Sequence, residues 1–373
     1  MTVSLCIIAY NEEKVLEELL RQVQAQSYPA RLTELVLVDS ASQDRTKEIF
    51  SEFARRFSQS YLSVGVYDNP RRSQAAGWNT ALRHATGDII IRLDAHAEIP
   101  EDFILQNVRL IESGEDICGG ARPNRIDRPT PFKKMLFLAE SSMFGSSIAG
   151  YRRQNEEKKY VRSLFHGAYR RDVFAAVGGF NEDLGRTEDN ELHNRIRRAG
   201  YRICQSSEIL SYQHIRGTLS SMLLQKFANG KWIGLTLGFC PRCLSVFHFV
   251  PFCFVLALLC GLFGLIAGAV SGIFWLMLPL PLLIGLYLTT DLIMTASAVA
   301  SAEEKHPVQF LLPAVFFLLH VVYGVGTLIG ILALPFLKAH IRRRNRRTGS
   351  SAEQEIEAVR QCVISNTKKE DQE

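Results

Sequence analysis

The chain has 373 residues, enough for two structural units, and a formal net charge of +5. Much of this charge lies in the stretch 338–347, KAHIRRRNRR, which indicates contact with a membrane surface rather than with nucleic acid. Eight cysteines are scattered without a disulfide-like framework, and the CPRC at 240–243 has no second pair. This usage argues against a zinc site and favours a reduced, cytosolic environment.

The mean hydropathy of +0.03 averages two unlike parts of the chain. Residues 1–240 are mixed and charged, whereas residues 244–337 contain no Arg, a single Lys (Lys305) and the acids Asp291, Glu303 and Glu304. The second composition is typical of a membrane segment. The N-terminal MTVSLCIIAYNEE has no basic region before its short apolar run, so we expect a first strand there and not a signal peptide.

Strands and helices are predicted to alternate over the first 93 residues. The strands are expected at 3–10, 35–38, 62–67 and 88–93, and the helices at 12–24, 44–57 and 73–85. The strands start about 30 residues apart, the length of a strand-plus-crossover unit, which predicts a doubly wound α/β domain. Neither G-x-G-x-x-G after the first strand nor G-x-x-x-x-G-K-[ST] occurs, so dinucleotide oxidoreductases and P-loop proteins lose their main support.

Polar residues stand where three of these strands end. They are Tyr10, Asn11 and Glu12 after the first strand, Asp39 after the second, and Asp94 and His96 after the fourth. Ligands of such sheets bind at the carboxyl ends of the strands, and each residue alone could equally be a helix or loop cap. Together they suit a nucleoside diphosphate, and Asp94 and His96, two residues apart, suit Mn²⁺ or Mg²⁺ beside a phosphate.

The second part of the predicted domain offers a different kind of carboxylate. Residues 145–160 are rich in Gly, Ser and charge, and we expect a mobile loop over the site, followed by a short strand at 166–169. Glu188 and Asp189 then stand at the start of a helix, where the dipole would keep a carboxylate ionised. Such a group can act as a general base, although ordinary first-turn acids have the same local pattern.

The remaining chain is predicted to meet the membrane. The segment 219–232 has an amphipathic, interfacial pattern, and the runs 244–270, 273–296 and 308–337 are long enough to span. Three spans would place the two ends of the chain on opposite sides, which conflicts with the basic stretch near the C-terminus. One run is therefore re-entrant or interfacial, with Pro279 and Pro281 marking a break, or the longest run is split, or the charge rule fails. We expect a charged tail from Ser350, disordered apart from a short helix.

Several ordered motifs within residues 1–235 resemble one family. They are YNEE, LVLVDSASQD, GWNTALRHATGDIIIRLDAHAE and GGFNEDLGRTEDNELHNRIRRAGY. These motifs are similar to those of family 2 inverting glycosyltransferases of the GT-A fold, a Rossmann-like doubly wound mixed sheet. DAHA, HGAYRRDVFAAVGGF and RTEDNEL further resemble the membrane-bound β-1,3-glucosyltransferases of succinoglycan-type exopolysaccharide synthesis.

The resemblance implies a role for individual residues. Asp39 would hold the uracil or ribose of a UDP-sugar, with Tyr10, Glu12 and Arg71 as further nucleotide-sugar contacts. Asp94 would take the first position of the D-x-D metal motif, and His96 departs from that motif by replacing its second Asp, which leaves the choice between Mn²⁺ and Mg²⁺ open. Asp189 matches the catalytic base, with Glu188 beside it. The acceptor side would include His166, Arg216 and Trp232.

The resemblance also implies a substrate and an organisation. We expect transfer of a sugar, with UDP-glucose as the expected donor, to a polyprenyl-diphosphate-linked saccharide at the cytosolic face of the inner (plasma) membrane. The expected parts are a catalytic domain (1–217), an interfacial linker (218–243), transmembrane helices (244–337) and a basic, charged tail (338–373). Gln225 and Trp232 only loosely match the motif of processive members, since Lys231 stands where that motif has Arg. Polyprenyl-monophosphate sugar synthesis, saccharide transport and a catalytically inactive scaffold remain as alternatives.

Overall fold

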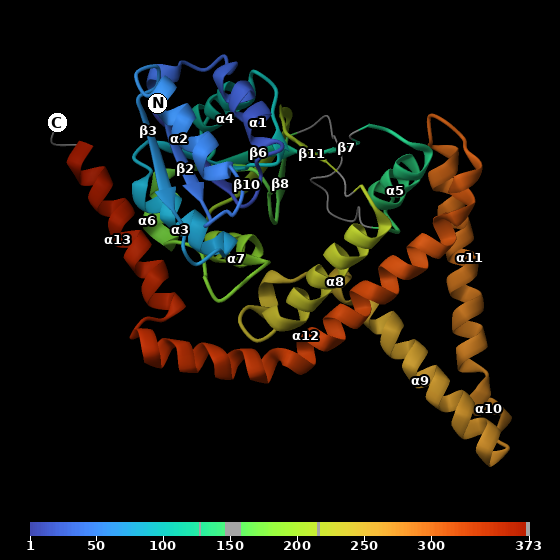
Figure 1. Ribbon diagram of the computed structural model, residues 1–373. Coiled ribbons are helices and arrows are strands. Elements are labelled where there is room, and N and C mark those ends of the chain that lie inside the picture. Colours follow the sequence, from blue (N-terminus) through green and yellow to red (C-terminus); the bar gives the residue numbers. More distant parts are fainter. Residues whose placement is uncertain (127, 146–157, 215–216, 371–373) are drawn as a thin grey trace. The chain divides into compact units, whose positions relative to one another are not determined.

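The computed structural model describes residues 1–126, 128–145, 158–214 and 217–370 of the chain (Figure 1). It divides into two compact units. The first comprises residues 1–123, 151–213 and 341–373, and the second comprises residues 124–150 and 214–340. Residues 341–373, which the sequence suggested as a separate tail, thus belong to the same unit as the N-terminal strands.

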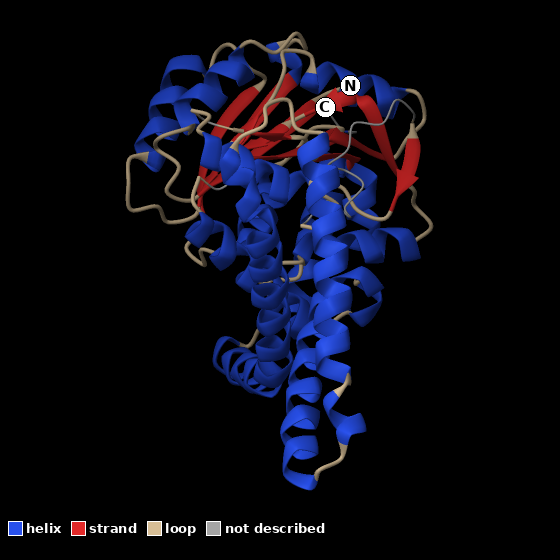
Figure 2. Ribbon diagram, turned by 90° about the vertical axis from the view of Figure 1, so that its right-hand side faces the viewer, coloured by secondary structure: helices blue, strands red, loops and turns tan. Residues whose placement is uncertain are grey.

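The first unit is built on an eight-stranded mixed sheet in the order β3-β2-β1-β4-β9-β6-β10-β8. Strands β1 to β4 run parallel, as predicted, whereas β9 is antiparallel to both β4 and β6. Figure 2 shows these strands together with helices over them. The strands are β1 (Val3–Ala9), β2 (Thr33–Asp39), β3 (Ser63–Asp68), β4 (Ile89–Asp94), β6 (Ile117–Ala121), β8 (Lys159–Val161), β9 (Gly167–Arg170) and β10 (Ile203–Leu210), and β5 (Ala97–Glu98) pairs with β11 (Tyr212–His214) beside them.

Both faces of this sheet are buried, because alternate residues of its strands enter two different apolar clusters. In β1, Val3, Leu5 and Ile7 enter one cluster, while Cys6 and Ile8 enter the other. The first cluster includes side chains of α1 (Leu16–Gln24), α2 (Thr46–Phe57) and α4 (Phe103–Glu112). The second includes side chains of α3 (Gln74–His84), α6 (Arg171–Val177), α7 (Glu188–Arg198) and α13 (Ala352–Glu370). This two-sided burial explains why the strands read as continuous apolar runs.

The register of the sheet brings the polar strand ends together. Ala9 at the end of β1 pairs with Asp39 of β2, and Ile8 pairs with Asp94 of β4. Asp39 and Asp94 therefore flank the end of the same central strand. This is the arrangement that the sequence predicted for the carboxyl edge of the sheet.

The helix α13 is longer and more firmly held than the short helix expected in the tail. Val359 and Val363 are fully buried in the second apolar cluster, and α13 lies against α6 and α3. The amide of Gly179 donates to the carbonyl of Ile356 at 3.2 Å, and Arg360 Nε donates to the carbonyl of Ala175 at 2.8 Å. The C-terminal helix is therefore a structural part of the first unit.

The second unit is mainly helical. It contains β7 (Asn124–Arg125), α5 (Pro131–Ser141), α8 (Leu219–Thr236), α9 (Val250–Ser271), α10 (Phe274–Met277), α11 (Pro279–Ala300) and α12 (Leu312–Thr348), the last of which continues into the first unit from residue 341. Three helical segments of the described chain are long and apolar enough to cross a membrane, namely 246–271, 274–300 and 307–348. They match the three predicted runs, and the break expected at Pro279 lies between α10 and α11.

Candidate active site

The loops that follow β1 and β2 are tied to each other. The amide of Asn11 donates to Ser42 Oγ at 3.0 Å, and the amide of Gln43 donates to Asn11 Oδ1 at 2.8 Å. The amide of Glu12 donates to Thr46 Oγ1 at 2.8 Å. Asn11 adopts a φ of 56°, a left-handed conformation that Asn tolerates better than most residues. These contacts fix the backbone around the end of the central strand.

Asp39 lies buried at this point, with only 2% of its surface exposed. Its Oδ2 accepts from the amide of Ser42 at 3.2 Å, while its Oδ1 has no hydrogen-bond partner among the described residues. A buried carboxylate oxygen without a partner is costly, so a hydrogen-bond donor from a ligand would stabilise it. Tyr10 follows the neighbouring strand and is 45% exposed, which leaves its ring available to a bound group.

Asp94 is the second buried carboxylate of this edge. Its Oδ1 lies 3.5 Å from Gln74 Nε2, and its Oδ2 lies 3.7 Å from His166 Nε2. Burial opposes its charge, but the contact with His166 and the nearby His96 and Arg92 outweigh burial and hold the pKa of Asp94 well below its usual range. The carboxylate is therefore ionised at neutral pH.

His166 lies against Asp94, although the sequence suggested it for the acceptor side. Its Nδ1 is 2.8 Å from Ser211 Oγ, and its Nε2 has no hydrogen-bond partner among the described residues. Burial lowers the pKa of His166 to about 4, so the imidazole is neutral at pH 7. A neutral ring with an open Nε2 beside an ionised carboxylate can bind either a cation or a hydrogen-bonding group.

His96 also contacts a residue at the end of another strand. Its Nδ1 lies 3.1 Å from Glu12 Oε1, which leaves Nε2 as its open ring nitrogen. Loss of solvent opposes protonation of His96, but Glu12 and Asp94 outweigh it and raise the pKa of the imidazole. The structure thus joins Glu12 with His96, and Asp94 with His166.

The donors at this edge suit a metal ion that is shared with a substrate. Among the described residues, no group of three or more His, Cys, Asp or Glu side chains surrounds a single point. Asp94 and His96 would supply one carboxylate and one imidazole. Mg²⁺ in nucleotide sites is commonly bound by one or two carboxylates together with substrate phosphates, and imidazole is acceptable to Mn²⁺. The residues therefore fit a divalent ion completed by a diphosphate, and do not form a closed protein cage.

Glu188 and Asp189 occupy the first turn of α7, behind Thr187, which has a φ of 73°. Burial and the adjacent Asp189 raise the pKa of Glu188, whose Oε2 has no hydrogen-bond partner among the described residues. Burial also raises the pKa of Asp189, although Arg92 and the amide of Asn190, 2.7 Å from Asp189 Oδ1, oppose the shift. The helix dipole was expected to keep these carboxylates ionised, and burial acts against that effect by raising both pKa values.

Arg92 is a further candidate functional residue, which the sequence did not single out. It lies on β4, two residues before Asp94 and thus on the same face of the strand, and it is only 4% exposed. Its guanidinium carbon lies 4.5 Å from the ring centroid of Trp78 and 4.7 Å from that of Phe180. Its charge favours the ionised forms of Asp94, Glu188 and Asp189. The sequence signal that could have identified Arg92 is a charged residue inside an otherwise apolar strand.

The catalytic helix candidate α7 is anchored by a buried polar chain. His193, one turn after Asp189, lies 2.8 Å from Tyr169 Oη through Nε2 and 2.9 Å from Ser163 Oγ through Nδ1. Burial, with Arg92 and Arg197 nearby, lowers the pKa of His193 to about 3, so the ring stays neutral. These two contacts tie α7 to β9 and to the segment that precedes it.

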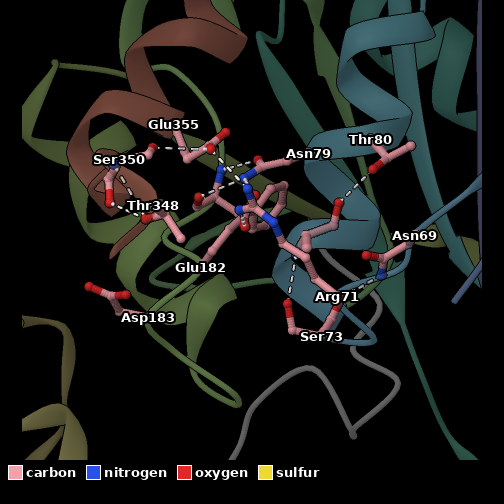
Figure 3. A network of polar contacts seen from close by, with 12 residues as sticks. Asn69, Arg71, Ser73, Asn79, Thr80, Glu182, Asp183, Thr348, Ser350 and Glu355 are labelled. Atoms are coloured by element: carbon pink, nitrogen blue, oxygen red, sulfur yellow. Dashed lines mark hydrogen bonds and ion pairs between the residues drawn. The ribbon is translucent and has the colours of Figure 1, made fainter. Parts of the chain in front are cut away.

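Arg71 makes contacts that differ from those suggested for it. Figure 3 shows its guanidinium between two carboxylates, Glu182 and Glu355, and the distance from Nη2 to Glu355 Oε1 is 3.0 Å. Asn79 Nδ2 donates to Glu182 Oε1 at 2.9 Å, and Arg83 pairs with the other oxygen of Glu355 at 2.7 Å. A nucleotide-binding role of Arg71 stays a prediction, and binding would compete with these two ion pairs.

The remaining predicted residues lie elsewhere. Trp232 belongs to α8 in the second unit. Arg216 and most of the predicted covering loop, residues 146–157, lie outside the described residues. The acceptor-side assignments therefore remain predictions, with His166 alone placed at the strand edge.

Comparisons with known proteins give the class of transferase to which this fold belongs. The family model described as glycosyl transferase family 2 matches residues 4–178. The succinoglycan biosynthesis protein ExoA of Rhizobium meliloti (strain 1021) is 30% identical over 237 residues, which are 62% of this chain and 68% of that protein. The chain therefore belongs to glycosyltransferase family 2.

Two further proteins match over most of the chain. The dolichyl N-acetyl-alpha-D-glucosaminyl phosphate 3-beta-D-2,3-diacetamido-2,3-dideoxy-beta-D-glucuronosyltransferase of Methanococcus voltae is 23% identical over 336 residues, or 88% of this chain and 97% of that protein. The mannosyltransferase PcManGT from Pyrobaculum calidifontis, solved in complex with GDP-Man and Mn²⁺, superposes with a TM-score of 0.55 and 21% identity, covering 87% of this chain and 86% of that one. The second likeness confirms the GT-A-like fold.

Proposed function

We propose that this protein is a membrane-anchored transferase that moves one sugar, with inversion, from a UDP-sugar to a polyprenyl-diphosphate-linked saccharide. One observation supports it above the others. Besides burial, the charge of Asp94 raises the pKa values of Glu188 and Asp189, so these carboxylates lie near one another although they come from distant parts of the chain. Such a neighbourhood would combine a diphosphate-binding edge with a proton acceptor.

The donor would bind at the ends of β1, β2 and β4. The unpartnered Oδ1 of Asp39 would accept from the uracil or ribose, with Tyr10 and Glu12 beside it. Asp94 and His96 would hold Mn²⁺ or Mg²⁺, which, when bound, neutralises charge on the diphosphate. UDP-glucose is the expected donor.

The acceptor hydroxyl would be activated from α7. In the transfer, the hydroxyl oxygen forms a bond to the anomeric carbon while the bond from that carbon to the diphosphate oxygen breaks, and the hydroxyl proton passes to Asp189. The raised pKa of Asp189 suits this role, because it brings the basicity of the carboxylate closer to the working pH. Glu188 would hold a hydroxyl of the acceptor, and His166, Arg216 and Trp232 remain the further acceptor candidates.

The acceptor class and location rest on the relatives and on the apolar helices. The relative from Methanococcus voltae carries a dolichyl-linked phosphate sugar in its name, and the relative from Rhizobium meliloti is named for succinoglycan biosynthesis. Helices long enough to cross a membrane would keep the active site near a lipid-linked acceptor. We place the protein in the inner (plasma) membrane with its active site on the cytosolic face.

The test is Asp189→Asn in the full chain, purified in detergent. We expect UDP-sugar binding, measured by calorimetry, to stay within about threefold, and transfer to a lipid-linked saccharide to fall by about 10³-fold. The matched control is Glu48→Gln, an exposed acid of α2, which should leave both unchanged. Transfer within about tenfold of the unchanged chain would contradict Asp189 as the base. Full activity of Asp189→Asn toward a polyprenyl monophosphate, whose attacking oxygen is already ionised, would instead indicate polyprenyl-monophosphate sugar synthesis.

A further inference from the structure

The position of the C-terminal helix α13 indicates on which side of the membrane the end of the chain lies. Val359 and Val363 of α13 are fully buried in the same apolar cluster as Trp78 of α3 and Phe174 of α6. Glu355 adds ion pairs to Arg71 and Arg83. A helix that completes the core of the first unit must lie on the same side of the membrane as its sheet.

The segment 124–150 must lie on that side as well. It leaves the first unit after Pro123, and the described chain is part of this unit again from residue 158, so an excursion through the bilayer would require two crossings. Two helical crossings need roughly 40 residues at about 20 residues each. The whole interval 124–157 has 34 residues, and its helix α5 has only 11. Its helix α5 is therefore inferred to lie on the same side of the membrane as the sheet.

Contacts with α5 then fix both ends of the α9–α11 pair. Lys226 of α8, the helix that precedes α9, forms a buried ion pair with Glu140 of α5 at 2.9 Å. Glu304, which follows α11, pairs with Lys134 of α5 at 2.6 Å. His320 of α12 also contacts the carbonyl of Phe144, just after α5, at 2.7 Å. The chain thus enters α9 and leaves α11 on the side that carries the sheet.

The α9–α11 pair has the dimensions of a membrane hairpin. Each helix has 22 residues, which corresponds to about 33 Å and matches a hydrocarbon core of about 30 Å. The two helices approach closely where Gly261 lies near Leu280 and Gly268 near Met277. In the most apolar 18-residue stretch of each segment, only 11% and 6% respectively is buried. Their outward apolar side chains therefore need lipid to cover them.

The third apolar segment, residues 307–348, differs from the other two, since 39% of its most apolar 18-residue stretch is buried. Gly326 and Gly330 of α12 bring its backbone against the carbonyls of Phe227 and Lys231 in α8. A different face of this helix exposes Leu332 and Phe336, which are 64% and 78% exposed. One face of α12 is therefore covered by protein, and another is apolar and exposed.

We propose that α9 and α11 are the two membrane crossings of this protein and that α12 lies along the membrane surface without crossing it. Both ends of α12 are on the side of the sheet, because its start follows the Glu304 loop and its end leads into α13. The exposed Leu332 and Phe336 would enter the lipid surface, in the manner of an interfacial helix. Exposed arginines at 342, 343, 346 and 347 follow directly on the same helix and would remain in the headgroup region.

Topology mapping of the full chain in sealed vesicles tests this arrangement. Short epitope tags are placed before Met1, after Glu373, at Gly272 between α9 and α10, and at Glu303 after α11. We expect protease to reach the first, second and fourth tags in one vesicle orientation and the Gly272 tag only in the opposite orientation. Gly272 has a φ of 74°, and no described atom lies within 4 Å of its Cβ position, so we expect a tag inserted there to meet no neighbouring side chain.

Two results would overturn the proposal. If the tag after Glu373 is cleaved only in the orientation that protects the tag before Met1, the number of crossings is odd and α12 spans the bilayer. If the Gly272 tag is cleaved together with the tag before Met1, the α9–α11 pair does not cross. The two terminal tags decide the first question without any insertion in the chain, so a misfolded insertion variant does not remove the test.

Discussion

Two sets of carboxylates in the first unit are both partly or fully withdrawn from solvent, and yet their pKa values shift in opposite directions. The pKa of Asp94 at the end of β4 is lowered, whereas the pKa values of Glu188 and Asp189 on α7 are raised. Burial opposes the charge of all three. Asp94 is compensated by His166, His96 and Arg92, whereas the charge of Asp189 raises the pKa of Glu188, that of Asp94 raises both, and Arg92 only partly offsets these effects.

The difference shows that neighbours, rather than burial, decide what each acid can do. An acid that stays ionised over the whole working range suits the binding of a metal and a diphosphate. An acid whose pKa is raised suits the acceptance of a proton. In the proposed function, Asp94 would therefore belong to a binding side and the two acids on α7 to a proton-transfer side, and the charge of Arg92 acts on both.

Asp94→Asn is expected to have the largest effect, because it removes the ionised carboxylate from the candidate metal ligands Asp94 and His96. We expect transfer to fall about a hundred- to thousandfold and the affinity for Mn²⁺ in the presence of UDP to fall with it. Metal affinity is measured by titration calorimetry, with Glu48→Gln as the control for purification and folding. Unchanged metal affinity in Asp94→Asn would break the assignment of Asp94 to the binding side.

Arg92→Met should move the pH profile of the reaction. Without the arginine charge the pKa of Asp189 rises further, so the limb where activity is lost as the pH falls should shift to higher pH. A shift of one unit corresponds to about 1.4 kcal/mol and lowers activity about tenfold on that limb. The profile is measured as kcat/KM against pH.

Arg92→Lys provides the matched control, since it keeps the charge. The acidic limb of its pH profile should stay close to its original position. Loss of packing alone would change the activity of both variants equally. An unshifted limb in Arg92→Met would show that the raised pKa of the α7 pair does not depend on this arginine.

His96→Asp is expected to have the smallest effect and sharpens the binding side. A carboxylate in place of imidazole should favour Mg²⁺ over Mn²⁺ by a few-fold, because Mg²⁺ prefers oxygen ligands. Activity is compared with each metal alone, and His96→Asn serves as a variant that removes the ring without adding charge. An unchanged metal preference in His96→Asp would mean that His96 does not bind the ion.

The sequence predicted those features of the structure that depend on residues close together in the chain. The strand ends of β1, β2 and β4 follow from apolar runs that stop at Tyr10, Asp39 and Asp94, because parallel strands bring their carboxyl ends to one edge. Arg92 was not identified, because its cost in a buried strand depends on Trp78 and Phe180, which come from other elements. The sequence predicted that the helix dipole favours the ionised forms of Glu188 and Asp189. It gave no sign that burial raises their pKa values, since the burial of α7 is set by residues far away in sequence.

The docking of α13 could not be predicted for the same reason. Its composition is polar and charged, and of its described side chains Val359 and Val363 are the ones that enter the apolar cluster, so the local pattern resembles a tail. Its burial depends on α3 and α6, which lie far earlier in the chain. Non-local packing of this kind leaves little trace in hydrophobic periodicity.

The place of α13 in the core has a consequence for biosynthesis. β10 ends at Leu210, and Val359 is about 150 residues later, with the apolar helices in between. At a synthesis rate of about 5–20 residues per second, the sheet waits roughly 8–30 s for its last helix. During that time the surface of Trp78 and Phe174 lacks its final cover, while α9 and α11 are already available for insertion. A nascent chain would therefore be attached to the membrane before its catalytic unit is complete.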